Sequence, residues 1–174
     1  MPPKLYPFQR AGVAFLVGAK QALIADEMGL GKGPQTIAAL EVLGDAAYPA
    51  LVVCPNSMKL TWSEEFRRWA PGRFVQVVHG GAATRRKQIE SVAAGEAEVA
   101  VINYESLRLH TRLAPYGSVS LSEEEKAPKE LNAVGFGAVV ADAAPRAKDP
   151  RAKQTRALWW VGDSARYRFA LTRT

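Results

Sequence analysis

The sequence contains few of the residues on which disulfide scaffolds and metal sites are built. Cys54 is the single cysteine among 174 residues, which excludes an internal disulfide. It ends the apolar run 51–53, and this position predicts a buried, inert thiol. The two histidines, His79 and His110, lack metal-ligand spacing, and no Ser/His/Asp, Cys/His or zinc-like constellation is present. Disulfide-stabilised scaffolds, zinc sites and triad hydrolases are therefore not supported.

Long apolar runs are absent as well. No segment approaches the roughly 20 apolar residues that span a bilayer. No apolar run of signal-peptide length follows the N-terminal residues 1–4. Hydrophobic residues nevertheless make up 48% of the chain, which argues against intrinsic disorder. We expect a soluble intracellular protein, in the cytoplasm, nucleoid or nucleus, with no membrane partner and one domain over residues 1–174.

Acidic residues are outnumbered, with 17 Asp and Glu against 23 Lys and Arg, and the formal charge is +6. The cations gather in two clusters. These are Arg67, Arg68, Arg73, Arg85, Arg86 and Lys87, and then Arg146, Lys148, Arg151, Lys153 and Arg156. Solvated helix faces are one interpretation. The other is phosphate contact with duplex DNA, which would be weak and non-specific.

Apolar runs alternate with segments of helical periodicity. Strands are expected near residues 22–25, 50–53, 74–78, 98–102, 138–142 and 167–171. Helices are expected near residues 7–20, 34–43, 57–69, 84–94, 104–113 and 152–162. Continuously apolar strands separated by helices predict a mainly parallel sheet that is covered on both faces. Residues 114–130 break the pattern with Pro, Gly, Ser and the run EEEK, and we expect a surface insertion there.

Residues 26–33 read DEMGLGKG and have the pattern of a phosphate-binding loop between a strand and a helix. Gly29 and Gly31 let backbone N–H groups close on phosphate oxygens, and Lys32 supplies a cation. In working loops a Ser or Thr follows the lysine, and its hydroxyl binds Mg²⁺. This chain has Gly33 there, which has no side chain.

Further motifs follow in a fixed order. They are residues 5–16 (LYPFQRAGVAFL), 52–55 (VVCP) with 62–66 (WSEEF), 102–107 (INYESL), 139–142 (VVAD) and 170–172 (ALT). Together with the loop, they resemble the first RecA-like lobe of a Swi/Snf-type superfamily 2 helicase-like ATPase, the branch of DNA translocases and chromatin remodellers. The resemblance implies a RecA-like three-layer α/β sandwich with a mainly parallel central sheet.

The resemblance also implies roles for single residues. Gln9 would read adenine, Gly29, Gly31 and Lys32 would bind phosphate, and Asp142 would hold Mg²⁺ through water. Each role has an alternative. Gln9 is otherwise a solvated helix residue, Lys32 an unused relic, and Asp142 the partner of a cation. The four tryptophans are expected in the core or against a partner lobe rather than under nucleic-acid bases; they are Trp62, Trp69, Trp159 and Trp160.

Two further motifs depart from the family pattern. The acidic motif Asp-Glu-Ala-His reads DAAP at residues 142–145, so the water-orienting glutamate is Ala143 and the histidine is Pro145. General-base catalysis contributes a factor of about 10²–10⁴, and a methyl group cannot provide it. Asp149 lies beyond Pro145 and is assigned no role. The third motif, Leu-Thr-Gly-Thr, reads LTRT at residues 171–174, which puts Arg173 where the family has glycine.

Three hypotheses remain. The leading one is a hydrolysis-deficient lobe without catalytic residues, since Gly33, Ala143 and a missing second RecA-like lobe each remove part of phosphoryl transfer. It would bind ATP or ADP weakly, with less help from Mg²⁺ than usual. The second is an interaction domain that binds no nucleotide. The third is half of an active DNA-dependent ATPase that uses unusual ligands.

We also expect Leu171 and Asp142 on nearby strands, where Arg173 either pairs with Asp142 or extends into solvent.

Overall fold

The computed structural model describes residues 4–26, 31–118 and 120–173, and its centre is a six-stranded sheet in the order β1-β6-β5-β2-β4-β3. All five strand pairs are parallel. The strands are β1 (Gln21–Asp26), β2 (Ala50–Cys54), β3 (Val75–Val77), β4 (Val99–Asn103), β5 (Ala138–Asp142) and β6 (Tyr167–Arg173). Every residue of β2 and β4 is buried, because their continuous apolar runs are covered on both faces. The predicted parallel α/β sheet is confirmed.

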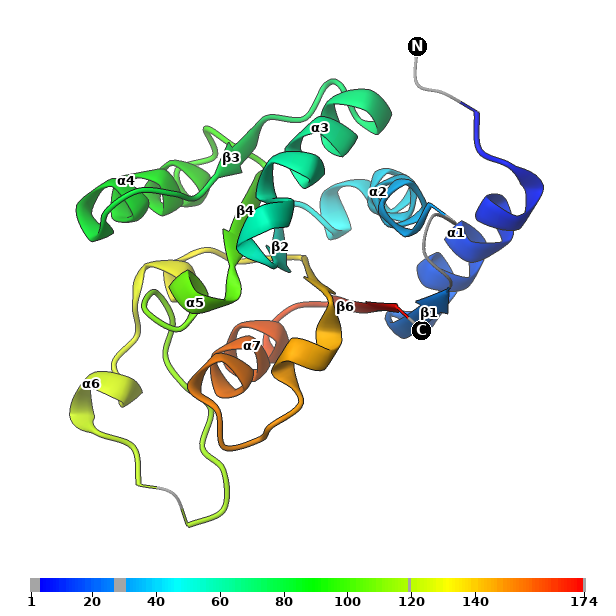
Figure 1. Cartoon of the computed structure of the whole chain (residues 1–174). Helices are drawn as coiled ribbons and strands as arrows, with labels where there is room; N and C mark the ends of the chain where they lie inside the picture. The colour runs from blue at the N-terminus through cyan, green and yellow to red at the C-terminus, as the bar shows by residue number, and fades with distance from the viewer. Residues whose placement is uncertain (1–3, 27–30, 119, 174) are drawn as a thin grey trace.

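Helices cover both faces of this sheet and give three layers (Figure 1). They are α1 (Pro7–Ala19), α2 (Lys32–Leu43), α3 (Lys59–Trp69), α4 (Ala82–Ala93), α5 (Tyr104–Leu107), α6 (Glu123–Lys126) and α7 (Lys153–Asp163). Short 3₁₀ turns are η1 (Gly44–Ala46), η2 (Asn56–Met58), η3 (Glu130–Ala133) and η4 (Ala144–Ala147). None of the described helices has the length and apolar surface that a bilayer crossing requires.

Two hydrophobic cores lie on opposite faces of the sheet. Helices α1, α2 and α3 pack Leu16, Ile37 and Phe66 against one face, where Val52 and Val140 point. Helices α4, α5 and α7 pack against the other face, which presents Leu51 and Val139. Alternate residues of β2 and β5 therefore enter different cores, as the period of two in a strand requires.

The expected helix over residues 104–113 is wrong beyond Leu107, where α5 ends. The chain instead turns toward η3. The N–H of Arg112 donates to the Asn132 side chain, and the carbonyl of His110 accepts from the N–H of Leu131. These partners replace the i→i−4 hydrogen bonds that would have continued the helix.

Residues 114–130 contain the short helix α6 and contact α7 at Ala114 and Glu125. The N–H of Ala114 donates to the carbonyl of Arg156, and Glu125 lies within 3.8 Å of the Arg156 guanidinium. Residues 115–118 are exposed. That this segment is an insertion relative to related proteins stays a prediction.

The register of the strands brings the sequence motifs to one edge of the sheet, the edge formed by the carboxyl ends of the strands. Asp142 at the end of β5 is paired with Leu171 of β6, which confirms the expected proximity of these strands. Strand β1 lies on the other side of β6 and leads into the loop before α2. Ligands of open parallel sheets bind at the carboxyl ends of the strands, so this edge is the place to look for a site.

Candidate functional site

A cleft of about 350 Å³ lies at this edge, between the start of α2, the helix α3 and the ends of β5 and β6. Its lining contains Gly31, Lys32, Gly33, Pro34, Met58, Thr61, Trp62, Glu65, Asp142 and Leu171. Three of the predicted site residues, Gly31, Lys32 and Asp142, therefore surround one space. Gly29 lies outside the described residues.

Lys32 is the first residue of α2, and its ammonium group points to the end of β6. The Nζ atom donates a hydrogen bond to the backbone carbonyl of Thr172 at 2.8 Å. The lysine thus joins the phosphate-loop pattern to the third motif. A phosphate group that enters the cleft meets this cation together with the N-terminal N–H groups of a 12-residue helix.

Gln9 of α1 lies against Gly31 at the end of the loop. Its side chain is only 7% exposed, so the interpretation as a solvated helix residue is wrong. The Oε1 atom accepts a hydrogen bond from the N–H of Tyr6 at 2.9 Å, which caps α1. A Cβ atom on Gly31 would lie 2.1 Å from Gln9 Nε2, and Gly31 has φ +76°. The backbone conformation therefore favours glycine at position 31, and a Cβ atom there would force the end of the Gln9 side chain to move.

Asp142 accepts hydrogen bonds from two neighbours. The indole N–H of Trp62 donates to Oδ2 at 2.8 Å, and the hydroxyl of Tyr104 donates to the backbone carbonyl at 2.6 Å. A neutral indole therefore holds one oxygen of the carboxylate, and the alternative that Asp142 pairs with a cation stays a prediction. Trp62 is 4% exposed and packs in the core, as predicted, but its role in orienting Asp142 was not foreseen.

Cys54, at the end of β2, is a free and buried thiol. Burial, with a smaller effect of the Asp142 charge, raises the pKa of the Cys54 thiol to about 12. The thiolate form is therefore scarce at neutral pH, and the predicted unreactive thiol agrees with this environment.

Glu65 is the cleft residue that sequence reasoning missed. It lies three positions after Trp62 on α3, and both side chains line the cleft. A Cβ atom on Gly33 would lie 3.9 Å from Glu65 Cγ, at ordinary van der Waals distance. Glu65 is distant in sequence from the acidic motif at residues 142–145, so that motif gave no indication of it. The spacing of Trp62 and Glu65, which places them on one side of a helix, was the available signal.

The departures of the acidic motif and of the third motif, Ala143 and Arg173, lie at this edge as well. Ala143 follows Asp142 directly and adopts a left-handed backbone conformation with φ +55°. Its methyl group carries no acid or base. The side chain of Arg173 lies outside the described part of the structure, so its pairing with Asp142 stays a prediction.

The donor chemistry of the cleft fits a nucleotide phosphate and its Mg²⁺ ion in part. Gly31 and Lys32 keep the phosphate features, while Gly33 offers no hydroxyl. Among the described residues, no group of three or more His, Cys, Asp or Glu side chains is placed to hold a metal ion. Mg²⁺ is, however, usually bound by one or two carboxylates plus substrate phosphates, and Asp142 and Glu65 match that description.

The basic clusters do not form two uniform surfaces. Arg73 lies between Glu41 and Glu98 and over the Tyr48 ring, 3.9 Å from its centre. Arg156 is 3% exposed. These two arginines are therefore parts of the folded structure. Arg67, Arg68, Arg86, Lys87, Arg146, Lys148, Arg151 and Lys153 remain exposed.

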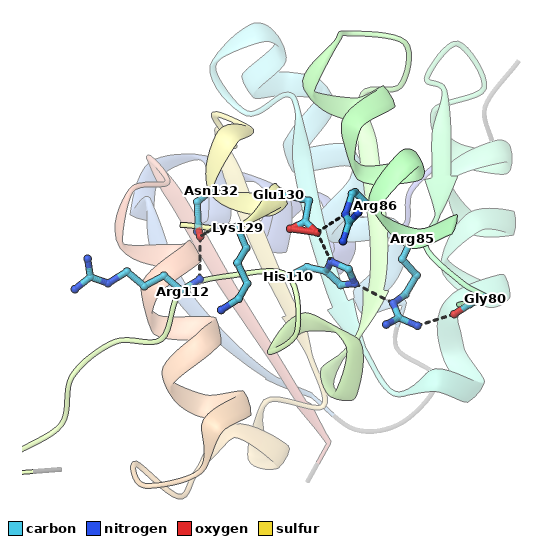
Figure 2. A network of polar contacts seen from close by, with 8 residues as sticks. All are labelled: Gly80, Arg85, Arg86, His110, Arg112, Lys129, Glu130 and Asn132. Carbon is cyan, nitrogen blue, oxygen red and sulfur yellow. Dashed lines mark hydrogen bonds and ion pairs between the residues drawn. The ribbon is translucent and has the colours of Figure 1, made fainter. Parts of the chain in front are cut away.

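His110 has a structural role that the sequence did not indicate. Figure 2 shows its buried ring between Arg85 and Glu130. The Nε–H of Arg85 donates to His110 Nε2 at 2.9 Å, and His110 Nδ1 lies 3.2 Å from Glu130 Oε1. Burial is the main reason why the pKa of His110 is lowered. The neutral ring, with its proton on Nδ1, satisfies both neighbours and ties α4 to η3.

Comparison with known proteins gives a consistent result. The family model described as "SNF2-related domain" matches residues 8–174. Protein CHROMATIN REMODELING 19 of Arabidopsis thaliana is 33% identical over 99% of this chain and 23% of its own length. Switch 2 of the same plant is 31% identical over 86% of this chain and 17% of its own length.

A solved structure agrees with these relatives. The SWI2/SNF2 ATPase core of Sulfolobus solfataricus, determined in complex with dsDNA, is similar to the whole chain with a TM-score of 0.77 at 27% identity. The chain corresponds to 33% of that structure. A DNA excision repair protein ERCC-6-like of Danio rerio is 42% identical over 49% of this chain and 6% of its own length. The chain thus spans less than a quarter of the curated relatives that it matches.

Proposed function

Because the chain belongs to the SNF2-related domain family, we propose that it is a helicase-like ATPase lobe that binds nucleotide weakly and does not hydrolyse it. One observation carries the proposal. The cleft joins Gly31, Lys32 and Asp142 with a glycine at position 33, and Ala143 follows at its edge. Relative to the family pattern, the phosphate-binding residues Gly31 and Lys32 are present, whereas the Mg²⁺-binding hydroxyl and the water-orienting glutamate are replaced by Gly33 and Ala143.

The argument against hydrolysis is chemical. Phosphoryl transfer needs a positioned water, a held cation and positive charge on the transferring phosphate. Ala143 cannot orient or deprotonate water, and Gly33 cannot contribute a hydroxyl. In the proteins that this chain resembles, the second lobe supplies the arginine that completes the transition state. ATP bound to this lobe alone is therefore expected to stay intact.

Binding of ATP or ADP rests on fewer groups and is expected to be weak. Gly31 and Lys32 supply phosphate contacts, and Gln9 beside Gly31 is the adenine-reading candidate. For this lobe taken by itself, we expect dissociation constants in the high micromolar to millimolar range, roughly 4 to 6 kcal/mol of binding free energy.

Duplex DNA is the partner class that we extend to this chain from the Sulfolobus solfataricus structure. The exposed cations of α3 and α4 are the candidate phosphate contacts; they are Arg67, Arg68, Arg86 and Lys87. Phosphate contacts carry no base information. Binding is therefore expected to be feeble, non-specific and sensitive to salt.

Calorimetric titration with ADP and ATP, combined with a phosphate-release assay, tests the proposal. Weak binding that is reduced in Lys32→Ala, without phosphate release, is the expected result. Absence of any binding would instead support an interaction domain. Phosphate release that Lys32→Ala abolishes would support the hypothesis of an active half-enzyme.

A second experiment restores the missing groups and tests whether their absence explains the loss of hydrolysis. In a protein joined to a second lobe, Gly33→Thr and Ala143→Glu together are expected to recover more turnover than the sum of the single changes. The hydroxyl and the carboxylate serve one transition state, so their effects are not independent.

A further inference from the structure

We propose that Glu65 supplies the cation-binding oxygen that position 33 lacks, so that nucleotide enters the cleft as its Mg²⁺ complex. This inference rests on the proposed nucleotide binding and adds a residue and a ligand form to it. It concerns a helix residue far in sequence from both the phosphate loop and the acidic motif.

The position of Glu65 is the first argument. Its side chain lines the same cleft as Gly33 and Asp142, and its Cγ atom lies 3.9 Å from the place of a Cβ atom on Gly33. A family member with threonine at position 33 would place a hydroxyl in this region. Here Glu65 is the side chain whose Cγ atom approaches this region.

The use of the Asp142 oxygens is the second argument. Trp62 donates its N–H to Oδ2 of Asp142. We therefore assign the hydrated cation to the other carboxylate oxygen, Oδ1. Mg²⁺ requires near-octahedral oxygen ligands and typically combines one or two carboxylates with phosphate oxygens and water. Asp142 and Glu65 together provide such a pair.

The charge in the cleft is the third argument. Two carboxylates, Glu65 and Asp142, line the cleft, and the Lys32 ammonium donates to the Thr172 carbonyl. Phosphate without a metal would bring like charges together. A divalent cation removes this repulsion, because it is attracted to the carboxylates and to the phosphate. Metal and nucleotide are therefore coupled ligands, and each raises the affinity for the other by the same factor.

Glu65→Gln tests the role of the carboxylate, because the amide has the same shape and cannot replace a charged ligand of Mg²⁺. The matched control is Glu64→Gln, which removes the same charge from an exposed position next to it on α3. Calorimetry measures the dissociation constant of ADP with Mg²⁺ and with a chelator for each protein. Binding of Mn²⁺, followed by electron paramagnetic resonance with and without ADP, is the second readout.

In the wild-type protein and in Glu64→Gln, Mg²⁺ is expected to tighten ADP binding at least about fivefold. In Glu65→Gln this ratio falls toward one, since Mg²⁺–ADP binds more weakly while metal-free ADP binds as well or better. Adding Gly33→Thr to Glu65→Gln restores the ratio, because the hydroxyl takes over the ligand position. The amount of Mn²⁺ bound in the presence of ADP, measured by electron paramagnetic resonance, is expected to be high in wild type and in Glu64→Gln, low in Glu65→Gln, and restored in the double variant.

Other outcomes overturn the proposal. An equal Mg²⁺ ratio in Glu65→Gln and wild type shows that Glu65 does not hold the cation, while nucleotide binding itself stands. Tighter binding of both ADP forms in Glu65→Gln shows that Glu65 only repels phosphate. If wild-type protein binds ADP in neither condition, the proposed function fails, and this inference fails with it.

Discussion

Trp62 of α3 donates its indole N–H to Oδ2 of Asp142 at 2.8 Å and thereby joins a helix to the carboxyl end of β5. The same helix carries Glu65 into the cleft one turn later. Helix α3 therefore orients one acidic residue of the site and contributes another. The family motif that surrounds Trp62 thus belongs to the cleft as well as to the core.

Trp62→Phe tests this contact. The change removes the donor to a carboxylate and shortens a ring that packs on Phe66. We expect the free energy of unfolding to fall by roughly 2–3 kcal/mol in urea denaturation. Trp159→Phe, at a position 43% exposed, is the control, with a change within about 0.5 kcal/mol. Equal small losses in both variants would show that the indole N–H contributes nothing measurable.

Gly31→Ala tests the close approach between α1 and the phosphate loop. A Cβ atom at 2.1 Å from Gln9 Nε2, on a residue with φ +76°, is expected to cost about 1–3 kcal/mol of folding stability. Gly18→Ala in α1, where a Cβ atom meets no atom within 4 Å among the described residues, is expected to be neutral or stabilising.

A double variant separates the two effects of Gly31→Ala. Gln9→Ala removes the clashing amide and should recover the steric part of the loss, whereas the backbone strain remains. Thermal unfolding of both single variants and the double variant supplies the cycle. Full additivity would show that Gln9 and position 31 do not interact.

The buried ring of His110 predicts a pH dependence of stability. Its folded pKa is lower than the unfolded value of 6.5, so the unfolded chain binds the proton more readily. Stability contributed by the neutral ring is therefore present above pH 6.5 and is lost as the pH falls toward the folded pKa. Urea midpoints between pH 7 and pH 5 measure this slope.

His110→Gln keeps a donor and an acceptor in the same place but does not titrate. It is expected to flatten the slope between pH 7 and pH 5, while His79→Gln, at an exposed position, leaves it unchanged. A wild-type slope retained in His110→Gln would assign the pH dependence to other groups.

DNA affinity should depend on the exposed cations alone. Lys87→Ala is expected to weaken binding to two unrelated duplexes equally and to reduce the slope of log K against log salt by about 1. Lys126, which lies outside both basic clusters and pairs with Glu123 at 3.6 Å, provides the control Lys126→Ala. Fluorescence anisotropy over a salt series measures both. Loss of affinity for only one duplex would contradict a backbone-only interaction.

The order of strands and helices was predictable because continuous apolar runs such as Leu51–Val53 are typical of buried parallel strands. The end of α5 was not, because Asn132 and Leu131, which replace the helical partners of residues 110–112, are distant in sequence. The same reason explains why Glu65 was missed and why Arg156 was counted among the cations expected on solvated helix faces or against DNA. Local patterns identify elements, whereas contacts between elements decide which charges are buried and which ones share a cleft.

Phosphorus NMR of Mg²⁺–ATP mixed with the chain and duplex DNA tests the central claim most directly, since one spectrum reports binding and hydrolysis together. We predict ATP resonances that are broadened by the wild-type protein, sharper with Lys32→Ala, and free of growing ADP and inorganic phosphate signals over hours. Inorganic phosphate that accumulates with the wild-type chain and not with Lys32→Ala would contradict the loss of hydrolysis. ATP lines that are identical with and without protein would contradict nucleotide binding.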